Sequence, residues 1–493
     1  MSELIILPSG ETSPRDCARQ IFRLAAAAKD LYWHGAVCTL GANGLNVVNP
    51  DTFRTWIERY GKLYAWRSGR DGKLVLQPAK MSRDDAKVIL ASQDASEMLP
   101  PVANVLRCPV ITEHDGQPVV LSKGYHPQMG GLLILEGEAP LDMTLADARK
   151  VLLWTVEDLD FQTPADKSRA LAARITPALK LGDWLSGSTP IEVMEADQPQ
   201  SGKGWSHQIS AAIYNTKATL VVQRTGGVGS WDESFGAAVA TGTPFIGLDN
   251  VRGKLNSPYL EGFLTAPGLY TVRLAGGANI QIDPRRHVLQ LTSNAMDSTP
   301  DLAARSSICR IRKQLGKMFP DSPEEIRRDI ALLIGAVFTI IKEYHRQGKP
   351  RTGERRHAFH EWAQTLDWIV QNLLGQAPLM DGHEEAQERV SNPEKTWLRA
   401  VANATESTGK LDLALTASGL AEVCQSQAIV IPGMGAAKDL EVAARSIGGI
   451  MRRLFGRLEK LAIENFTVKR TVQQYRKASG DMDSRHAYTF EAI

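Results

Sequence analysis

The sequence has few cysteines, no paired metal-binding motif and no long apolar run. Its five cysteines are scattered and never closer than 21 residues, which excludes a C-x-x-C metal site and predicts reduced thiols. The ten histidines form no H-x-x-x-H pair with a nearby acid, so the pattern does not favour a zinc site. No repeat of about 20 to 50 residues is visible, which sets solenoids and propellers aside.

Membrane and secretory signals are also missing. The most apolar run, 330–341, has 12 residues, whereas a membrane-spanning helix needs about 20, so we expect a buried core helix there. The first residues show no basic stretch followed by a long apolar core, so no signal peptide is expected. The net charge of +2 gives no overall nucleic-acid signal and leaves any basic surface local. These absences predict a soluble, cytoplasmic protein without a membrane partner.

The remaining composition is that of an ordinary globular protein with several domains. A chain of 493 residues with 43% hydrophobic and 23% charged residues is too long for one core and suggests about three or four domains. Helix and strand patterns are mixed in the first 150 residues, apolar strand patterns alternate with helix patterns from about 185 to 312, and helix patterns follow. We expect an N-terminal α+β domain of unassigned role, a sheet-containing domain, a helical segment and a C-terminal domain, at residues 1–150, 151–320, 321–380 and 395–493.

Short apolar runs indicate the strands of the second domain. They are typical of a buried, mostly parallel sheet, so the predicted fold class is α/β. The charged, turn-rich stretch 381–395 is typical of a linker, and the last hundred residues are expected to be mainly helical. The expected strands are 191–196, 219–225, 244–250 and 287–294.

The stretch MEADQPQSGKGW, 194–205, departs in two places from the phosphate-loop pattern G-x-x-x-x-G-K-[ST]. Asp197 stands where the first Gly belongs, and Gly204 where the Ser or Thr belongs. A strand pattern precedes the stretch and a helix pattern follows it, the context in which backbone N–H groups and a helix N-terminus hold phosphates. Gly202 would let the backbone close on the phosphates, and Lys203 would reach the β- and γ-phosphates. Taken alone, the pattern is also compatible with a chance SGKG.

Three further elements follow at strand or helix ends. An apolar strand ends in Asp249 and Asn250, 46 residues after Lys203; in P-loop ATPases such a strand lies beside the P-loop strand and its Asp holds Mg²⁺. The next strand ends in Asn294, which would orient the attacking water, and Arg305 follows 11 residues later. An arginine given to a neighbouring subunit's nucleotide would stabilise charge on the transferring phosphoryl group. Each residue singly is also typical of a turn or a solvated charge, but their order favours a nucleotide site.

With these residues in place, the chain resembles the AAA+ helicase-type ATPases of phages, plasmids and integrated mobile elements, relatives of superfamily 3 and MCM-like helicases. The most specific part is LDNVRGKLNSPYLEGFLT, 248–265, in which Asp-Asn is followed by a small loop and a Leu-Thr helix. Weaker similarity extends upstream, and downstream to a part that resembles a winged helix. The resemblance implies a P-loop AAA+ ATPase core with a mixed α+β N-terminal domain, a helical segment and a C-terminal winged-helix-like DNA-binding domain.

The family also implies ligands and residue roles. ATP and Mg²⁺ are the implied cofactors, and Asp249 is the implied metal ligand, directly or through water. The implied catalytic residues are the Walker A lysine, the Walker B acid with its neighbour, the sensor asparagine and the arginine finger: Lys203, Asp249, Asn250, Asn294 and Arg305. ATP is expected to contact the loop and the helix start: Pro199, Gln200, Ser201, Gly202, Lys203, Gly204 and Trp205.

Departures from the family pattern concern hydrolysis. Asn250 replaces the Walker B glutamate that polarises water in many AAA+ proteins, and Gly204 removes the hydroxyl that normally binds Mg²⁺. Ser201, Ser206 or a water would have to fill that place. Asp197 adds negative charge close to the phosphates. Slow or absent hydrolysis is therefore an open alternative.

DNA contacts are expected in two places. Strand-like runs flank Gly276-Gly277, which is a hairpin signal, and in the resembled helicases a hairpin at this place points into the hexamer channel. The C-terminal basic cluster is typical of a winged helix placed in a groove, or of the wet face of an amphipathic helix. The predicted DNA-binding residues are Arg252, Lys254, Arg273, Arg285, Arg286, Arg452, Arg453 and Arg470.

Our first functional hypothesis is a hexameric ATP-dependent DNA helicase or translocase that acts in replication of a phage or mobile element. Its expected partners are single-stranded DNA, further copies of the chain, and a primase or another replication protein. The alternative is a DNA-binding initiator or scaffold with a switch-like or degenerate nucleotide site, which Asp197, Gly204 and Asn250 favour. A small-molecule P-loop kinase would be a compact monomer with a lid domain, and the long C-terminal part fits it less well.

Overall fold

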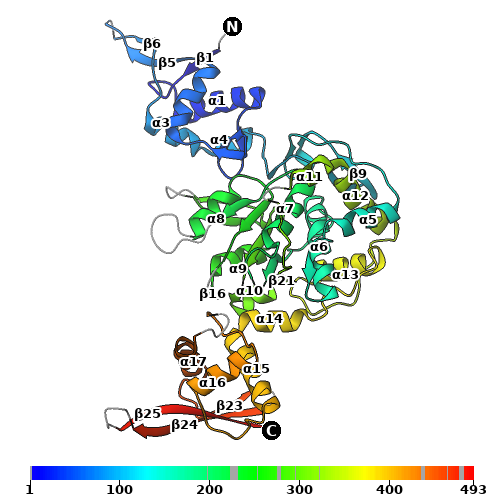
Figure 1. Ribbon diagram of the computed structural model, residues 1–493. Helices are drawn as coiled ribbons and strands as arrows, with labels where there is room; N and C mark the ends of the chain where they lie inside the picture. Colours follow the sequence, from blue (N-terminus) through cyan, green and yellow to red (C-terminus); the bar gives the residue numbers. More distant parts are fainter. Residues whose placement is uncertain are drawn as a thin grey trace. The chain divides into compact units, whose positions relative to one another are not determined.

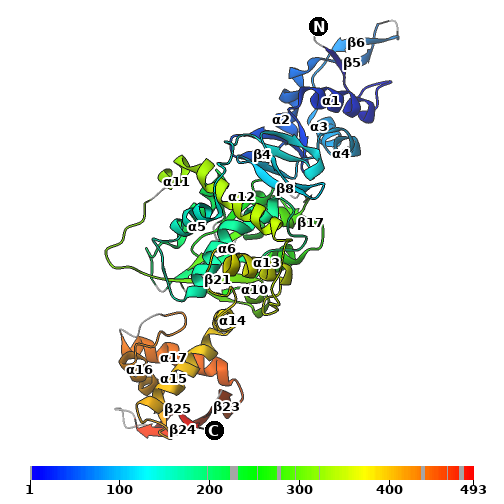
Figure 2. The same cartoon turned by 90° about the vertical axis from the view of Figure 1, so that its right-hand side faces the viewer.

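The computed structural model describes residues 3–70, 72–196, 198–221, 231–251, 254–274, 279–294, 296–320, 323–434, 439–463, 465–476 and 482–492. The chain divides into two compact units (Figures 1 and 2). Among the described residues, every helix is too short or too polar to span a bilayer. The first unit comprises Met1–Val251, Ser257–Asn294 and Arg305–Asp381, and the second comprises Arg252–Asn256, Ala295–Ala304 and Gly382–Ile493.

The N-terminal part of the first unit has a hydrophobic core of its own around helix α1. This helix begins because the Ser13 side chain accepts a hydrogen bond from the Asp16 backbone N–H and Pro14 occupies the first turn. Its small sheet has the order β1–β5–β6, with β1 parallel to β5. The elements are β1 (Glu3–Ile6), α1 (Pro14–Ala28), α2 (Pro50–Trp56), η1 (Ile57–Arg59), β5 (Gly61–Ser68), β6 (Leu74–Pro78), α3 (Arg83–Leu90) and α4 (Gln93–Met98).

Short strands lead from this part to the centre of the unit. They form small sheets with the orders β2–β3–β4, β10–β11–β7 and β8–β9. The elements are β2 (Tyr32–Trp33), β3 (Val37–Gly41), β4 (Gly44–Val47), β7 (Asn104–Leu106), β8 (Val110–His114), β9 (Gln117–Leu121), β10 (Gly124–His126), η2 (Pro127–Met129) and β11 (Leu132–Ile134).

The centre of the first unit is a sheet with the order β12–β21–β13–β19–β15–β14. All neighbouring pairs except β12–β21 are parallel, which confirms the predicted α/β fold class and mostly parallel sheet. The expectation that the strand ending at Asp249 lies beside the P-loop strand is wrong, because β19 pairs with both and separates them. The strands are β12 (Asp160–Phe161), β13 (Ile191–Ala196), β14 (Thr219–Val221), β15 (Phe245–Leu248), β19 (Val288–Ser293) and β21 (Ser306–Arg312).

Helices that come before, between and after the sheet strands in the sequence pack against the sheet and share one hydrophobic core with it. The apolar run 330–341 lies in α12 and is largely buried, which confirms the predicted core helix. Trp362, Leu366 and Ile369 of α13 join the same core, so the predicted helical segment packs together with the sheet. The helices are α5 (Leu145–Trp154), α6 (Pro164–Leu181), α7 (Lys203–Ile213), α11 (Glu324–Arg328), α12 (Ile330–Arg346) and α13 (His360–Asn372).

Between β15 and β19 the chain forms the predicted hairpin, with β17 antiparallel to β18. Its glycines Gly276 and Gly277 lie outside the described residues. Edge-to-face rings, Phe235 against Phe263 and Tyr259 against Tyr270, pack the helices near it. The elements are α8 (Trp231–Val239), α9 (Pro258–Thr265), β17 (Tyr270–Arg273), β18 (Asn279–Ile282) and η3 (Pro284–Arg286).

In the second unit, the last helix, α17, is followed by β23 and by a long hairpin, β24–β25, and the short strand β22, between α15 and α16, pairs with β25. Its core contains residues of the helices and of the hairpin. The elements are β16 (Lys254–Leu255), β20 (Asp297–Ser298), α10 (Pro300–Ala304), α14 (His383–Ser391), α15 (Pro393–Ser407), β22 (Leu415–Thr416), α16 (Ala417–Ser426), α17 (Leu440–Phe455), β23 (Lys460–Ile463), β24 (Phe466–Arg476) and β25 (Met482–Ala492).

Two sequence expectations for this unit hold only in part. The division between the two units falls at the start of the stretch 381–395, but this stretch is helical: His383, Ala386 and Val390 bury one face of α14, and its three glutamates are exposed. The last hundred residues are mainly helical only up to Phe455, the end of α17. The Val- and Thr-rich strand β24 pairs along its whole length with β25, and Val468 is buried at their base.

Candidate nucleotide-binding site

The loop after β13 enters α7 through residues with a left-handed backbone. Gln200 has a φ of +60°, and Gly202, the N-cap of α7, has a φ of +95°. Position 202 requires glycine because of this φ and because an added Cβ would lie 2.5 Å from Phe319 Cζ. The N-terminus of α7 therefore opens at the carboxyl edge of the sheet, as in phosphate sites. Asp197 lies outside the described residues.

The predicted Walker A lysine contacts the predicted sensor residue. Lys203 Nζ donates to Asn294 Oδ1 over 2.6 Å, to the Gln198 carbonyl over 3.2 Å and to Ser201 Oγ over 3.3 Å. Asn294 follows β19, the direct neighbour of β13, so the sheet brings the two side chains together. The ammonium group is held at the loop, where it would meet a phosphate.

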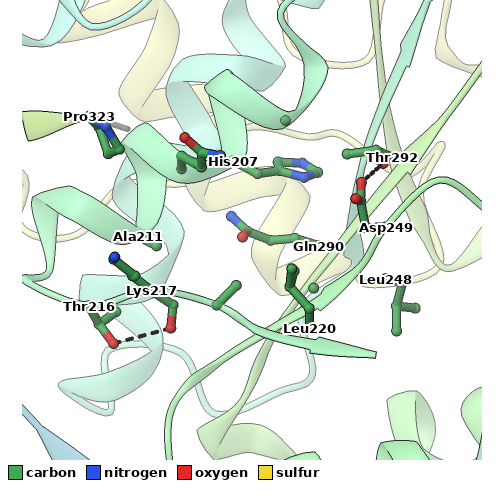
Figure 3. A pocket seen from close by; sticks show the side chains of 14 residues that line it. His207, Ala211, Thr216, Lys217, Leu220, Leu248, Asp249, Gln290, Thr292 and Pro323 are labelled. Carbon is green, nitrogen blue, oxygen red and sulfur yellow. Dashed lines mark hydrogen bonds between the residues drawn. The ribbon is translucent and has the colours of Figure 1, made fainter. Parts of the chain in front are cut away.

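The predicted Walker B residues are fixed by a threonine. Asp249 is exposed, and its Oδ1 accepts from Thr292 Oγ1 over 2.6 Å (Figure 3). The same Thr292 hydroxyl accepts from the Asn250 backbone N–H over 2.8 Å, and Asn250 has a φ of +51°. Sequence reasoning missed Thr292. Its signal was its place two residues before Asn294, on the same face of β19.

This arrangement fits Mg²⁺ held by one carboxylate and by phosphate oxygens. Asp249 would supply the carboxylate, and the described residues contain no cluster of three His, Cys, Asp or Glu side chains for a closed metal site. Of the three alternatives for the missing hydroxyl, Ser206 is disfavoured, because its hydroxyl is buried and accepts from Arg174 over 2.9 Å. Ser201 lies in the loop before α7, beside Lys203, and remains one of the alternatives for the missing hydroxyl. At Gly204 an added Cβ meets nothing within 4 Å, so space for a hydroxyl is open.

A buried arginine on α6 holds α7 from the side of the core. The fully buried Arg174 donates to the hydroxyls of Ser206 and Ser210. Burial lowers the pKa of Arg174 to about 10, against the opposing effect of Glu192. Burial also raises the pKa of Glu192 to about 7, and Gln290 donates to its Oε2 over 3.3 Å. The helix that would hold the phosphates is thus tied to α6 by charge-assisted hydrogen bonds.

A cavity of about 290 Å³ lies between α7 and the strands β14, β15 and β19 (Figure 3). His207 projects into it from α7, and Gln290 from β19. Burial lowers the pKa of His207 to about 3, helped by the charge of Arg174. The cavity borders the predicted phosphate site, because Gly204 and Asp249 also line it.

The predicted arginine finger lies at the other edge of the sheet. Arg305 precedes β21, whose first residue, Ser306, pairs with Ile191 at the start of β13. The length of β13 therefore separates Arg305 from the loop, about 20 Å at roughly 3.3 Å per residue. Its ion-pair partner is Glu261 at 4.0 Å. The structure does not bring Arg305 to the phosphate loop of its own chain.

The basic residues predicted to contact DNA in the first unit differ in their exposure and in whether they already form ion pairs within the chain. Arg285 and Arg286 each form an ion pair with an aspartate at 2.8 Å, and Arg286 has only 12% of its side chain exposed. Arg273 is exposed at the end of β17. Arg252, which belongs to the second unit, lies outside the described residues. The hairpin thus presents Arg273, while Arg286 serves an intramolecular contact.

The basic residues predicted in the second unit are also unequal. Arg452 is exposed on α17, whereas Arg453 pairs with Glu394 at 2.6 Å. The Arg470 guanidinium lies 5.5 Å from an aromatic ring of α17 and donates to a backbone carbonyl. Lys254 is exposed in β16.

Comparisons with known proteins give only distant likeness. No protein-family profile and no curated protein matches the chain. The chain is similar to the apo structure of the NrS-1 C-terminal region, with 9% identity, 95% of this chain and 98% of that chain covered, and a TM-score of 0.37. It is also similar to Cch of SCCmec type IV, described as an active helicase, with 12% identity, 86% and 89% covered, and a TM-score of 0.32. At such TM-scores the likeness carries no functional argument, so function rests on the residues of the site.

Proposed function

We propose that this protein is an AAA+ type ATPase that works as an oligomeric DNA helicase or translocase in replication of a phage or mobile element. The observation that carries the proposal is the convergence of Lys203, Asn294 and Asp249 at the carboxyl edge of a parallel sheet, beside the N-terminus of α7. Proteins bind the phosphates of nucleoside triphosphates at such an edge, where strand ends meet a helix N-terminus.

Each residue has a role in this proposal. The α7 N-terminus and Lys203 bind the β- and γ-phosphates, and Asn294 orients the attacking water. Asp249, fixed by Thr292, holds Mg²⁺ through water. When bound, the metal ion neutralises charge on the transferring phosphoryl group.

Oligomerisation, proposed here as a ring of six, is supported by the place of Arg305. Since this residue lies at the amino edge of the sheet, it serves as an arginine finger only for the nucleotide of a neighbouring copy. Lys203→Ala and Arg305→Ala proteins should each hydrolyse ATP poorly, and mixing them should restore hydrolysis at interfaces that combine an intact Lys203 with an intact Arg305. An arginine acting within its own chain would give no recovery at any mixing ratio.

DNA binding is supported by two features. The β17–β18 hairpin presents the exposed Arg273, and from α15 onward the second unit has the order helix, strand, helix, helix and β-strands with a hairpin, which is expected of a winged-helix-like domain. Within that unit, Arg452 on α17 is the exposed candidate for a phosphate contact.

The test of the proposal is ATP hydrolysis with and without single-stranded DNA. We expect DNA to stimulate hydrolysis several-fold and Lys203→Ala to abolish it, because the ammonium group meets the transferring phosphate. Absence of both ATP binding and hydrolysis in folded wild-type protein would contradict the proposal.

A second function, a nucleotide-switched DNA-binding initiator or scaffold, is favoured by one observation. Gly204 offers no hydroxyl to Mg²⁺, and the nearby Ser206 hydroxyl is buried against Arg174. Such a protein would bind ATP and assemble with it, but turn over no faster with DNA. The same assay, with a mass measurement in the presence of nucleotide, separates the two functions.

A further inference from the structure

The nucleobase end of the site can be located from the order of the strands. Resting on the proposed nucleotide site, we infer that the segment 313–320, which follows β21, forms the wall on which the base of the nucleotide stacks, with Phe319 as its aromatic contact. No pattern in the sequence marks this segment, which contains only one aromatic residue.

The direction of the bound nucleotide follows from the sheet order β21–β13–β19–β15. Asn294 and Asp249, which face the γ-phosphate and its metal ion, lie after β19 and β15 on one flank of β13. The α-phosphate, ribose and base must leave the loop on the other flank. That flank is occupied by β21, and the chain that leaves its carboxyl end is the segment 313–320.

Phe319 lies against the phosphate loop itself. The atoms nearest to a Cβ built on Gly202 are its Cζ, Cε2 and Cε1, at 2.5, 2.8 and 2.9 Å. The far edge of the ring therefore touches the loop at the residue that precedes Lys203. A ring in this place is within reach of a base whose phosphates sit on the loop.

The segment is anchored by contacts with residues just before and just after the neighbouring strand β12. Lys317 Nζ pairs with the Asp158 carboxylate, and Gln314 Nε2 donates to the Asp158 carbonyl over 2.7 Å. Arg312, at the end of β21, donates to the Gln162 carbonyl over 3.2 Å. These contacts hold the short turn at 314–317, which leads directly to Phe319.

The segment also carries apolar surface without cover. Leu315 is 95% exposed and Met318 is 89% exposed, the highest values among the large apolar side chains of the described residues. Exposed apolar groups beside a polar phosphate site are suited to a flat, weakly polar ring system. An aromatic ring with sulfur and aliphatic neighbours is a stacking surface for a purine or pyrimidine.

Binding of ATP and of inorganic tripolyphosphate, both with Mg²⁺, tests the inference, because tripolyphosphate has no base. Phe319→Ala should weaken ATP binding about ten-fold or more and leave tripolyphosphate binding within about two-fold. Phe319→Tyr, which keeps the ring, should bind ATP like the wild type. Leu269→Ala serves as the control, since Leu269 is also an exposed apolar side chain, 66% exposed, but lies between α9 and β17.

The outcomes separate this inference from the function on which it rests. Unchanged or tighter ATP binding by folded Phe319→Ala protein would overturn the stacking role. An equal loss for ATP and tripolyphosphate would also overturn it, since the ring would then only shape the loop. Wild-type protein that binds neither ligand would overturn the nucleotide site itself, and the inference with it.

Discussion

Two glycines of the phosphate loop differ in what they allow. Gly202 has a positive φ and touches the Phe319 ring, so any side chain there strains the backbone and displaces the ring. Gly204 lies one residue inside α7, and its missing side chain faces open space beside the cavity that reaches Asp249. The first glycine is therefore required by the loop, whereas the second only leaves out a hydroxyl.

We predict opposite effects for substitutions at these two positions. Gly202→Ala should weaken ATP binding at least ten-fold, because the loop cannot close around the phosphates. Gly204→Ser should fold normally and speed ATP hydrolysis several-fold, because it returns the hydroxyl ligand that Mg²⁺ has in standard loops. Steady-state hydrolysis and nucleotide binding measure both effects. Slower hydrolysis by a stable Gly204→Ser protein would show that the loop has no use for the hydroxyl.

At the scale of elements, α7 is positioned by the buried Arg174. The two hydroxyls that accept its hydrogen bonds, Ser206 and Ser210, lie one turn apart on the face of α7 toward α6. A buried guanidinium that loses an acceptor is costly, about 1–3 kcal/mol, because water cannot replace the missing partner. Arg174, Ser206 and Ser210, which we call the α7 clamp, therefore hold α7 in place only when all three side chains are present.

Removing one hydroxyl should accordingly cost more than removing the whole set. We expect Ser206→Ala to lower the free energy of unfolding by about 1–3 kcal/mol. The triple variant Arg174→Met, Ser206→Ala, Ser210→Ala should regain most of that loss, because the buried guanidinium is removed together with its acceptors and Glu192, whose pKa burial raises to about 7, can bind a proton once its positive neighbour is gone. Urea unfolding measures both variants, and a triple variant less stable than Ser206→Ala would contradict this view of the clamp.

The sequence predicted individual strands and the polar residues at their ends better than the arrangement of the strands. Lys203, Asp249 and Asn294 could be found because polar residues ended apolar runs, and the structure brings these ends to one edge. The insertion of β19 between β13 and β15 could not, since strand order depends on contacts distant in sequence. The proposed base wall at Phe319 had no signal in the sequence, because only the fold places this ring against Gly202.

Errors in the C-terminal part have a local cause. The segment of α14 is rich in charge and turn residues, and its narrow buried face, Ala386 and Val390 with His383, is easily missed. The strand β24 mixes basic and β-branched residues, and its pairing with β25 decides its conformation. Tertiary contacts thus overrode composition in both elements.

At the scale of the whole molecule, buried histidines link stability to pH. Burial lowers the pKa of His207 and His287 to about 3 and that of His357 to about 4. The unfolded chain therefore binds protons below pH 6.5 that the folded chain does not, and stability present above pH 6.5 is lost as the pH falls. Glu192, whose pKa is raised to about 7, acts in the opposite sense and offsets about one histidine.

We predict a loss of about 2–3 kcal/mol in the free energy of unfolding between pH 6 and pH 5, at about 1.4 kcal/mol per proton and pH unit. His207→Gln should reduce this loss by about 1 kcal/mol, since one titrating group is removed. Urea unfolding at the two pH values provides the measurement. Equal stability at pH 6 and pH 5 would contradict the neutral state of these histidines.

The central claim is that Lys203, which lies with Asn294 and Asp249 at the carboxyl edge of the parallel sheet, binds a nucleoside triphosphate. Equilibrium binding of ATP with Mg²⁺ tests it most directly, with Lys62→Ala as the matched control. Lys62 is an exposed lysine of β5, in the N-terminal part that has a hydrophobic core of its own. We predict at least a hundred-fold loss of affinity for Lys203→Ala and no change for Lys62→Ala. Equal binding by both variants, or no binding by the folded wild type, would contradict the claim.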